Sequence, residues 1–426
     1  MRIDFPYYQG IPPLEVPYRN LIGIYEPPCV EATAPETALI HRAFDNPIGR
    51  PPIRRAASDA RNALVITDDY TRNTPVRPIL DRLMAELEAA GVPADRTTIL
   101  VALGTHRTMT DSEMETRFGE EIVRRYRIVN HEWRNEDQLV ALGATETGIP
   151  IRVNRLVEDV DFIFGIGQIV PHRVAGFSGG GKIIQPGICG AETTAETHWR
   201  SALYPGGEIL GVADNPIRQG IEQVAAHVGL SAIANAVCDA DGRLIDLFVG
   251  DPVAAHRAGA RLSSRIYGFE LPEPADVLLI DSYPMDIELW QAAKALYAGE
   301  LALKKDGVAI LVSPCPEGVS RTHGLILSEG YRPSQETISL VESGRIPDKI
   351  VASHLVRVGR VIRDNGSAGI LVSPGISAEH KERLGFLHAS TPHEALGLAL
   401  DIKGRDASVM VIRRGGTSLP LLPDKP

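Results

Sequence analysis

The chain has 426 residues, of which 44% are hydrophobic and 23% charged, a composition typical of globular proteins that excludes the disordered and fibrous classes. This length exceeds a single core of ordinary size, so we expect two domains of the α/β kind. The formal net charge of −10 argues against nucleic acid as the main partner, because a phosphate backbone is bound by an excess of lysine and arginine. It leaves room for one local basic site.

The first residues, Met1 to Pro6, lack the charged-then-apolar pattern of a secretory signal, and no apolar run is long enough to cross a bilayer. We therefore expect a cytoplasmic protein with no membrane partner. Four cysteines occur without the spacing of a zinc site or a redox pair. We expect free, buried thiols at all four: Cys29, Cys189, Cys238 and Cys315.

The segment up to about Pro52 is rich in proline and poor in strand patterns, which indicates an arm or hairpin. From Asn62 onward, apolar runs alternate with helical patterns in a βαβα order. The predicted elements are strand 62–67, helix 75–91, strand 98–103, helix 111–125 and strand 161–167.

A linker at Glu273-Pro274 precedes a second series of elements. These are strand 275–280, helix 287–298 and strands 307–312, 369–372 and 408–412, followed by a tail that we expect to be unstructured. The predicted fold class is α/β, with domains 1–272 and 275–407 and a final strand and tail, 408–426. Ser313-Pro314 and Ser373-Pro374 end two of these strands, which predicts that both ends line one edge.

Polar residues follow the first predicted strand in the segment 68–75, Asp-Asp-Tyr-Thr-Arg-Asn-Thr-Pro. A strand's carboxyl end beside helix amides suits an anion. Arg72 has the planar fork that binds a carboxylate or phosphate with two parallel hydrogen bonds. The alternative is that Asp69, Thr71 or Thr74 only caps the helix and Arg72 pairs with an aspartate.

A histidine, His106, lies at the end of the next predicted strand, between Thr105 and Thr108. An imidazole titrates near neutrality and is therefore suited to proton transfer. The alternative is a solvated loop histidine.

A glycine loop follows the strand 161–167 and runs from Pro171-His172 to Gly181-Lys182. Its spacing matches the phosphate-loop pattern Gly-x-x-x-x-Gly-Lys, but Ile183 stands where that pattern needs Ser or Thr to hold magnesium. Lys182 is suited to pair with a phosphate or, if desolvated, to act as an amine nucleophile. A helix that starts near Ala191 brings His198 back toward the loop, unless His198 is a surface histidine.

In the second series, Gln291 and Lys294 are three residues apart and therefore share one helix face, next to Trp290. They either close a site or belong to a solvated helix face.

Together these motifs resemble the nickel-dependent lactate racemase family. The resemblance covers most of the chain and rests on five motifs in order: Asp69-x-x-Arg72 with Thr74-Pro75, Gly104-Thr105-His106-Arg107, Pro171-His172 through Gly181-Lys182, His198, and Gln291-x-x-Lys294.

The resemblance implies a nickel-pincer nucleotide, pyridinium-3-thioamide-5-thiocarboxylic acid mononucleotide, whose two sulfur-containing arms hold a nickel ion. In that family a lysine of the glycine loop bonds covalently to the cofactor and a histidine completes the nickel coordination. The matching residues are Lys182 and His198. Further cofactor contacts are implied for Asp69, Thr71, Ser178, Gly179, Gly180 and Gly181.

The resemblance also implies a racemase or epimerase of a small 2-hydroxy acid, with its active site in a cleft between the two domains. His106 and His172 would be acid and base on opposite faces of the substrate, and Arg72 would bind its carboxylate. Gln291 and Lys294 would reach substrate or cofactor, and Trp290 stands where we expect tyrosine in members that act on lactate.

The chemistry agrees with this implied reaction. Loss of a proton from the α-carbon beside a carboxylate is very unfavourable, whereas loss of a hydride needs only an electrophilic acceptor and a base on the hydroxyl group. The expected partners are the 2-hydroxy acid and the proteins that make the cofactor. Two other functions stay open: a phosphate-loop nucleotide hydrolase and a non-catalytic nickel or cofactor carrier.

Overall fold

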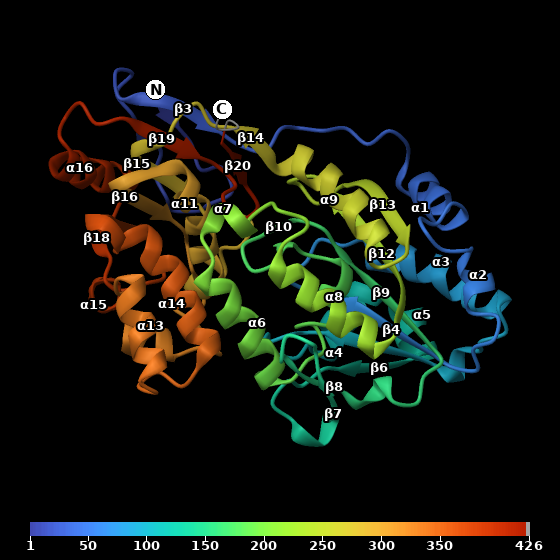
Figure 1. Ribbon diagram of the computed structural model, residues 1–426. Coiled ribbons are helices and arrows are strands. Elements are labelled where there is room, and N and C mark those ends of the chain that lie inside the picture. Colours follow the sequence, from blue (N-terminus) through green and yellow to red (C-terminus); the bar gives the residue numbers. More distant parts are fainter. Residues whose placement is uncertain (423–426) are drawn as a thin grey trace. The chain divides into compact units, whose positions relative to one another are not determined.

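The computed structural model describes residues 1–422, which fall into two compact units (Figure 1). The glycine-loop unit consists of Cys29–Thr197 and Val212–Ile266. The C-terminal unit consists of Met1–Pro28, His198–Gly211 and the chain from Tyr267 onward. The division differs from the predicted ranges 1–272 and 275–407, because two earlier segments belong with the C-terminal residues.

A six-stranded sheet of order β13-β12-β9-β4-β5-β6 forms the centre of the glycine-loop unit. Only β13 is antiparallel to its neighbour. The strands are β4 (Ala63–Asp68), β5 (Thr97–Ala102), β6 (Arg127–Asn130), β9 (Phe162–Gln168), β12 (Leu230–Cys238) and β13 (Leu244–Gly250). Three of them confirm the predicted strands 62–67, 98–103 and 161–167 within one residue at either end.

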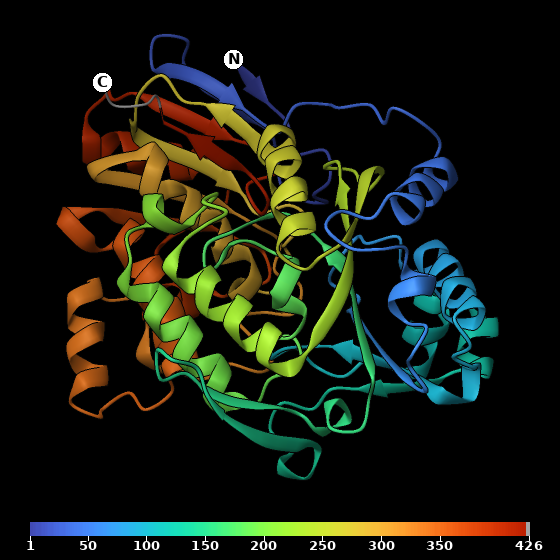
Figure 2. The same cartoon turned by 45° about the vertical axis from the view of Figure 1, so that its right-hand side comes forward.

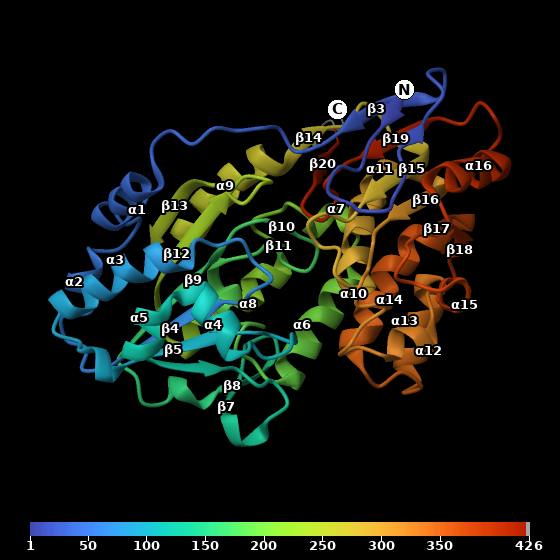
Figure 3. The same ribbon diagram turned by 180° about the vertical axis from the view of Figure 1, so that it is seen from behind.

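Both faces of this sheet are covered. In β4, Ala63 and Val65 pack in one apolar cluster with residues of helix α3, while Leu64 and Ile66 pack in another with residues of helix α8. Figure 1 shows α8 in front of the sheet, and Figure 3, the view from behind, shows α3 on the opposite side. A strand buried on two faces is apolar throughout, as is usual in parallel sheets.

The helices of the glycine-loop unit are α1 (Glu36–Asp45), α2 (Ile53–Ala56), α3 (Val76–Ala89), α4 (Asp111–Phe118), α5 (Glu120–Arg125), α8 (Pro216–Val228) and most of α9 (Ala254–Tyr267). Two small antiparallel pairs join them: β7 (Leu139–Ala144) with β8 (Pro150–Asn154), and β10 (Pro171–His172) with β11 (Gly176–Phe177). Helix α6 (Ala191–Leu203) contains the boundary between the units. The predicted helix 111–125 is divided at Gly119, whose φ of 87° is incompatible with a helix.

The C-terminal unit has a six-stranded parallel sheet of order β18-β17-β16-β15-β19-β3. Its strands are β3 (Leu21–Tyr25), β15 (Ala275–Asp281), β16 (Leu303–Val312), β17 (Ala368–Val372), β18 (Leu387–Ala389) and β19 (Val409–Ile412). β16 and β17 are neighbours, and the Ser373 hydroxyl donates to the Pro314 carbonyl at 3.2 Å. This contact confirms that the two Ser-Pro ends share one edge.

The remaining elements of this unit are mostly helical. The helices are α7 (Gly206–Ile209), α10 (Leu289–Ala292), α11 (Gly299–Ala302), α12 (Leu325–Glu329), α13 (Ser334–Glu342), α14 (Lys349–Ile362), α15 (Ala378–Arg383) and α16 (Pro392–Lys403). Two short strand pairs complete the unit: β1 (Arg2–Ile3) pairs with β2 (Leu14–Glu15), and β14 (Gly268–Glu270) pairs with β20 (Leu419–Leu421). The predicted helix 287–298 is α10 followed by a 3-10 helix, Ala293–Ala298. Among the described residues no helix is both long and apolar enough to span a bilayer.

Three sequence-based expectations are wrong. The N-terminal segment is an arm only in part, since β3 pairs with β19 along the sheet edge (Figures 1 and 2) and α1 is a regular helix. The tail contains β20, which pairs with β14; residues 423–426 lie outside the described residues. Cys29 is exposed because it lies in the irregular segment between β3 and α1, whereas the other three cysteines are buried and all four are free.

We predict that Asn20→Ala destabilises the C-terminal unit. The buried Asn20 amide donates to the carbonyls of Arg405 at 2.8 Å and Ala407 at 2.9 Å, and so fastens the segment before β3 to the segment before β19. Removal of the amide leaves the buried Ala407 carbonyl without this donor, at a cost of about 1–3 kcal/mol. Thermal unfolding should show a lower midpoint, with the exposed Asn46→Ala nearly unchanged as the control. Equal midpoints for the two variants would contradict this assignment.

Candidate functional site

Three strands of the glycine-loop unit end at one edge of its sheet. β4 pairs in parallel with β5, Asp68 opposite Ala102, and with β9, Thr67 opposite Ile166. Carboxyl ends of parallel strands meet at the same edge, which is where open α/β sheets bind ligands. The segments that follow these ends carry the three predicted polar motifs.

The first two motifs meet in a buried ion pair. Nδ1 of His106 lies 2.6 Å from Oδ2 of Asp69, and Oδ1 of Asp69 accepts from the amide of Thr71 at 3.0 Å and from its hydroxyl at 2.6 Å. Burial raises the pKa of the Asp69 carboxyl, but the charge and hydrogen bond of His106, with further help from Arg72, outweigh it and hold the pKa well below its usual range. Asp69 is therefore ionised, and Nδ1 of His106 carries a proton.

This geometry decides two of the open alternatives. His106 is a histidine oriented by a buried carboxylate, not a solvated loop residue. Nor does the side chain of Asp69, Thr71 or Thr74 cap helix α3, because the N-cap of that helix is Pro75 and no side chain accepts a capping hydrogen bond there. Instead, the Thr74 hydroxyl donates to Oδ2 of Asp68 at 2.5 Å.

An arginine that the sequence did not single out supports the same segment. Arg117 on α4 forms an ion pair with Asp68 and donates to the carbonyl of Arg72 at 3.0 Å. Burial raises the pKa of Asp68, and the charge of Arg117 opposes this shift. In the sequence, Arg117 is one charged residue of an amphipathic helix, and no spacing marks it.

The predicted carboxylate-binding residue, Arg72, is half-buried. Its Nη1 donates to the carbonyl of Thr71 at 3.4 Å, and within residues 1–422 its side chain makes no ion pair with a carboxylate. The neighbouring Arg107 instead binds both carboxylate oxygens of Glu113, at 2.6 and 2.9 Å, and lies over the Tyr70 ring.

The third motif begins at β10, where His172 pairs with Gly176 of β11. The backbone amide of Val174 donates to Nδ1 of His172 at 3.2 Å. In the neutral ring, Nε2 of His172 therefore carries the proton. The two histidines thus differ, because His106 carries its proton on Nδ1.

The backbone of the glycine loop fits tightly against the protein. The Ser178 hydroxyl donates to the Gln168 carbonyl at 2.6 Å, and the Gly180 amide donates to Oδ1 of Asn235 at 2.7 Å. A side chain at Gly179, where φ is 72°, would come within 2.7 Å of Ile169 and Asn235. Lys182 follows in a short 3-10 helix, Gly180–Ile183, and is half-buried.

The loop does not form a phosphate loop. In that motif the lysine and the following hydroxyl residue open an α-helix, whereas Lys182 lies in a four-residue 3-10 helix and the next α-helix begins at Ala191. Ile183 is buried in an apolar cluster and blocks any side chain at Gly165, at a separation of 2.7 Å. The position after Lys182 therefore serves the core and not a metal ion.

The remaining predicted residues lie in the C-terminal unit. Nζ of Lys294 donates to Oε1 of Gln291 at 2.5 Å, which confirms that the two share one face. The Trp290 ring is stacked between the rings of His323, with centroids 3.9 Å apart, and His354, at 4.4 Å. Sequence reasoning missed both histidines, because nothing within 30 residues of Trp290 indicates which rings pack on it.

His198 lies on α6 and is half-buried; its carbonyl accepts a hydrogen bond from Arg357 at 2.6 Å. The structure over residues 1–422 contains no group of three or more His, Cys, Asp or Glu residues placed to hold a metal ion. A nickel ion bound here would need donor atoms besides the His198 imidazole, and the pincer cofactor that the sequence implies carries its own.

The fold and this set of residues define an α/β protein in which His106, His172 and a lysine-bearing glycine loop follow the ends of neighbouring strands. Residues 7–207 match the lactate racemase N-terminal domain, and residues 273–419 match the lactate racemase C-terminal domain. The chain belongs to the lactate racemase family, as its motifs predict.

Two lactate racemases are similar in sequence to this chain over nearly their whole length. Lactate racemase from Thermoanaerobacterium thermosaccharolyticum is 29% identical, with 97% of each chain covered, and that from Lactiplantibacillus plantarum is 28% identical, with 97% of this chain and 98% of the relative covered. The structure of the T. thermosaccharolyticum lactate racemase apoprotein covers 99% of this chain and all of its own, with a TM-score of 0.86 and 28% identity. A Thermotoga maritima protein, 25% identical over 89% of this chain and 100% of its own, superimposes with a TM-score of 0.71.

We predict that Asp69→Asn lowers the thermal unfolding midpoint in a pH-dependent way. The folded-state pKa of Asp69 lies below its unfolded value of about 3.9, so the ionised carboxylate stabilises the fold above that pH, and this contribution is lost as the pH falls below it. The gap between wild type and variant should be widest near neutrality and narrow from about pH 5 to about pH 2.

Asp401→Asn provides the control, because Asp401 belongs to an exposed i,i+4 ion pair with Arg405, and such pairs contribute little. The thermal unfolding midpoint of Asp401→Asn should equal that of the wild type at every pH measured. A gap for Asp69→Asn that stays constant with pH would contradict the ionised Asp69–His106 pair.

Proposed function

We propose that the protein is a racemase or epimerase of a 2-hydroxy acid, of the lactate racemase type, and that it uses a nickel-pincer nucleotide attached to Lys182. The observation that carries the proposal is the convergence of the Asp69–His106 pair with His172 and the glycine loop at three neighbouring strand ends. The names of the two curated relatives, each matched over 97% of this chain, support it.

The residues of this chain fit the proposed cofactor. Lys182 presents an amine directly after three glycines, whose bare backbone lets a flat ring approach closely. Asp69, Thr71, Ser178, Gly179, Gly180 and Gly181 are the further cofactor contacts that we propose. His198 would give nickel an imidazole ligand, which is an ordinary donor for that metal. When bound, the cofactor supplies an electrophilic carbon that accepts a hydride from the substrate α-carbon.

His106 and His172 move the hydroxyl proton. Because Asp69 holds the proton of His106 on Nδ1, the neutral ring has its lone pair on Nε2 and is a base. Because Val174 donates to Nδ1 of His172, the neutral ring has its proton on Nε2 and would donate a hydrogen bond to the substrate oxygen. Transfer of a proton from this ring would require its doubly protonated, imidazolium form. A neutral histidine on one face of the substrate would take the hydroxyl proton, and an imidazolium on the other face would return a proton to the oxygen. The two rings would then have exchanged protonation states, and with them their roles, for the next turnover.

Other residues orient the substrate. Arg72 would bind the carboxylate through two parallel hydrogen bonds, which fixes the plane that the two histidines face. Gln291 and Lys294, already joined at 2.5 Å, would contact substrate or cofactor, and Trp290 would pack on the substrate side chain. The stacking of Trp290 between two histidine rings holds its orientation.

A non-catalytic cofactor carrier is the second candidate. A carrier requires Lys182 and His198 but has no use for a histidine held by a buried carboxylate. Cofactor-loaded protein incubated with single-enantiomer 2-hydroxy acids, lactate first and then larger ones, separates the two by chiral chromatography. Formation of the opposite enantiomer or epimer supports the enzyme and identifies its substrate, whereas its absence across the panel supports the carrier.

We predict that His106→Ala and His172→Ala lower kcat by about 10²–10⁴-fold, the usual contribution of a general acid or base. Nickel content and the covalent adduct should stay at wild-type levels, because neither histidine is a proposed ligand. His227→Ala, at an exposed position of α8, is the matched control and should turn over normally. Unchanged turnover in either active-site variant would remove that histidine from the mechanism.

We predict that Lys182→Ala and Lys182→Arg both abolish the covalent adduct in intact-mass spectra of protein loaded with cofactor. Arginine keeps the positive charge but lacks the amine that forms the bond, so it separates covalent attachment from charge pairing. An adduct that persists in both variants would show that another residue carries the cofactor.

A further inference from the structure

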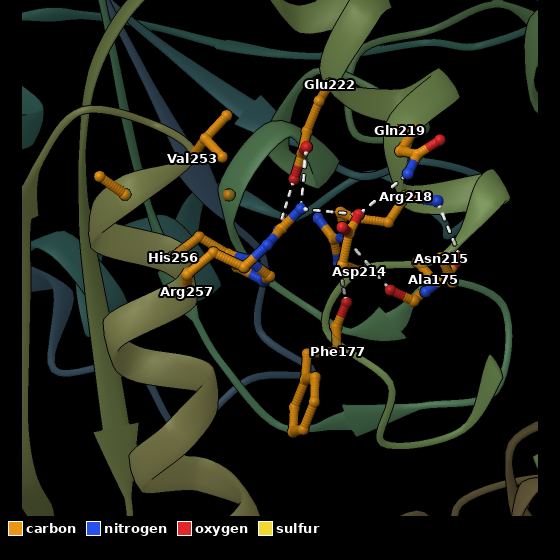
Figure 4. Close-up of polar contacts among 12 residues, drawn as sticks. Ala175, Phe177, Asp214, Asn215, Arg218, Gln219, Glu222, Val253, His256 and Arg257 are labelled. Atoms are coloured by element: carbon orange, nitrogen blue, oxygen red, sulfur yellow. Dashed lines mark hydrogen bonds and ion pairs between the residues drawn. The ribbon is translucent and has the colours of Figure 1, made fainter. Parts of the chain in front are cut away.

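A fully buried arginine donates hydrogen bonds to the backbone of the glycine loop. Arg218, on the first turn of α8, donates from Nε to the carbonyl of Ala175 at 3.2 Å, from Nη1 to that of Gly179 at 3.1 Å, and from Nη2 to that of Phe177. Figure 4 shows its guanidinium among the loop carbonyls. One side chain thus serves three carbonyls within five residues.

A buried histidine binds the carbonyl that lies between them. Nε2 of His256, on α9, is 2.9 Å from the carbonyl of Ser178, and Nη1 of Arg257 is 3.2 Å from Nδ1 of His256. The carbonyl only accepts and the arginine only donates, so Nε2 carries the proton and the ring is neutral. Burial, with the charges of Arg218 and Arg257, holds the pKa of His256 far below its usual range, in agreement with a neutral ring.

The two helices that carry these side chains are themselves held in place. Oδ1 of Asn215 accepts from the amides of Ile217 and Arg218 at 3.1 and 2.9 Å, and so caps α8. Arg257 binds both carboxylate oxygens of Glu222, at 2.7 and 3.1 Å, and thereby ties α9 to α8 (Figure 4).

The start of α8 also interlocks with the loop. Gly176 has a φ of 78°, and a Cβ there would lie 1.9 Å from the carbonyl oxygen of Val212. The chain before α8 therefore passes directly against the loop, and only glycine fits at this point.

A buried cation without a directly bonded carboxylate is unusual, because burial of a charge is costly unless dipoles or an opposite charge compensate it. Here the three carbonyl dipoles point at the guanidinium, and Glu222 contributes an attractive charge. Burial lowers the pKa of Arg218 to about 9, with Glu222 opposing the shift, so the side chain stays protonated at neutral pH. Only a planar fork of donors reaches three carbonyls; an ammonium group is a point charge.

We propose that Arg218, assisted by His256, is a positioning residue for the glycine loop: it holds the backbone of residues 175–179 in one conformation, so that His172 before it and Lys182 after it keep a productive geometry. This inference rests on the proposed function of His172 and Lys182. Neither Arg218 nor His256 touches the reacting atoms in this account; both act through the loop.

The test compares Arg218→Met, Arg218→Lys and Val224→Ala. Val224 is a buried core residue on the same helix, and its aliphatic side chain makes no hydrogen bond to the loop backbone, which makes it the matched control for a loss of packing. Three quantities are measured: amide hydrogen exchange of residues 172–182 in cofactor-free protein, the rate of adduct formation on Lys182, and kcat and KM separately.

For Arg218→Met we expect loop amides that exchange at least about tenfold faster, adduct formation at least about tenfold slower, and a fall in kcat that exceeds any change in KM. Arg218→Lys should be intermediate, because it keeps the charge and reaches fewer carbonyls. Val224→Ala should lower the unfolding midpoint and leave all three quantities unchanged. Wild-type exchange and adduct rates in Arg218→Met, or effects of equal size in Val224→Ala, would overturn the proposal.

Two further outcomes are also decisive. If Arg218→Met does not fold, Arg218→Lys and His256→Gln, which disturb fewer loop contacts, are measured in the same way, and unchanged loop exchange in both overturns the proposal. If wild-type protein forms no adduct, the proposed function fails, while the exchange comparison in cofactor-free protein still decides whether Arg218 holds the loop.

Discussion

The parallel pairing of β5, β4 and β9 is the constraint on which the candidate site depends. This pairing places the loops that follow the three strands at the same edge of the sheet. As a result, Nδ1 of His106 lies 2.6 Å from Oδ2 of Asp69, although the two residues are 37 positions apart in the sequence. The register of β4 is well specified because the strand is buried on both faces. A slip of one residue would move Val65 and Ile66 each into the apolar cluster on the opposite face. Core packing therefore determines where Asp69 and His106 lie.

Buried charges around this edge are each compensated by directional contacts. Asp69 is met by His106 and Thr71, and Arg218 by three backbone carbonyls. In a protein interior of low polarity, such a group costs free energy of folding when it has no hydrogen-bond partner. When all its hydrogen bonds are made, it holds its surroundings rigidly. Asp69 and the backbone amide of Val174 assign opposite proton positions to the neutral rings of His106 and His172. Preorganisation of this kind is what proton transfer in a racemase requires.

Membership of the lactate racemase family and the geometry of the site support the proposed function in different ways. The relatives, at 28–29% identity over nearly the full chain, indicate the reaction class. The geometry gives individual residues a role that physical chemistry can test: a carboxylate orients one histidine, a backbone amide orients the other, and a clamped loop bears the lysine. Trp290, stacked between His323 and His354, is the position at which we expect substrate preference to be set.

The sequence by itself determined the α/β class, the main strands, the three polar strand ends and the contact of Gln291 with Lys294, because each follows from a pattern within a few neighbouring residues. It missed β3 as an edge strand, the exposure of Cys29, and the helix residues Arg117, Arg218 and His256. Those three side chains bind segments 39 to 78 residues away. Local periodicity shows that a side chain is buried, but only the packing of distant elements decides which buried polar atom it meets.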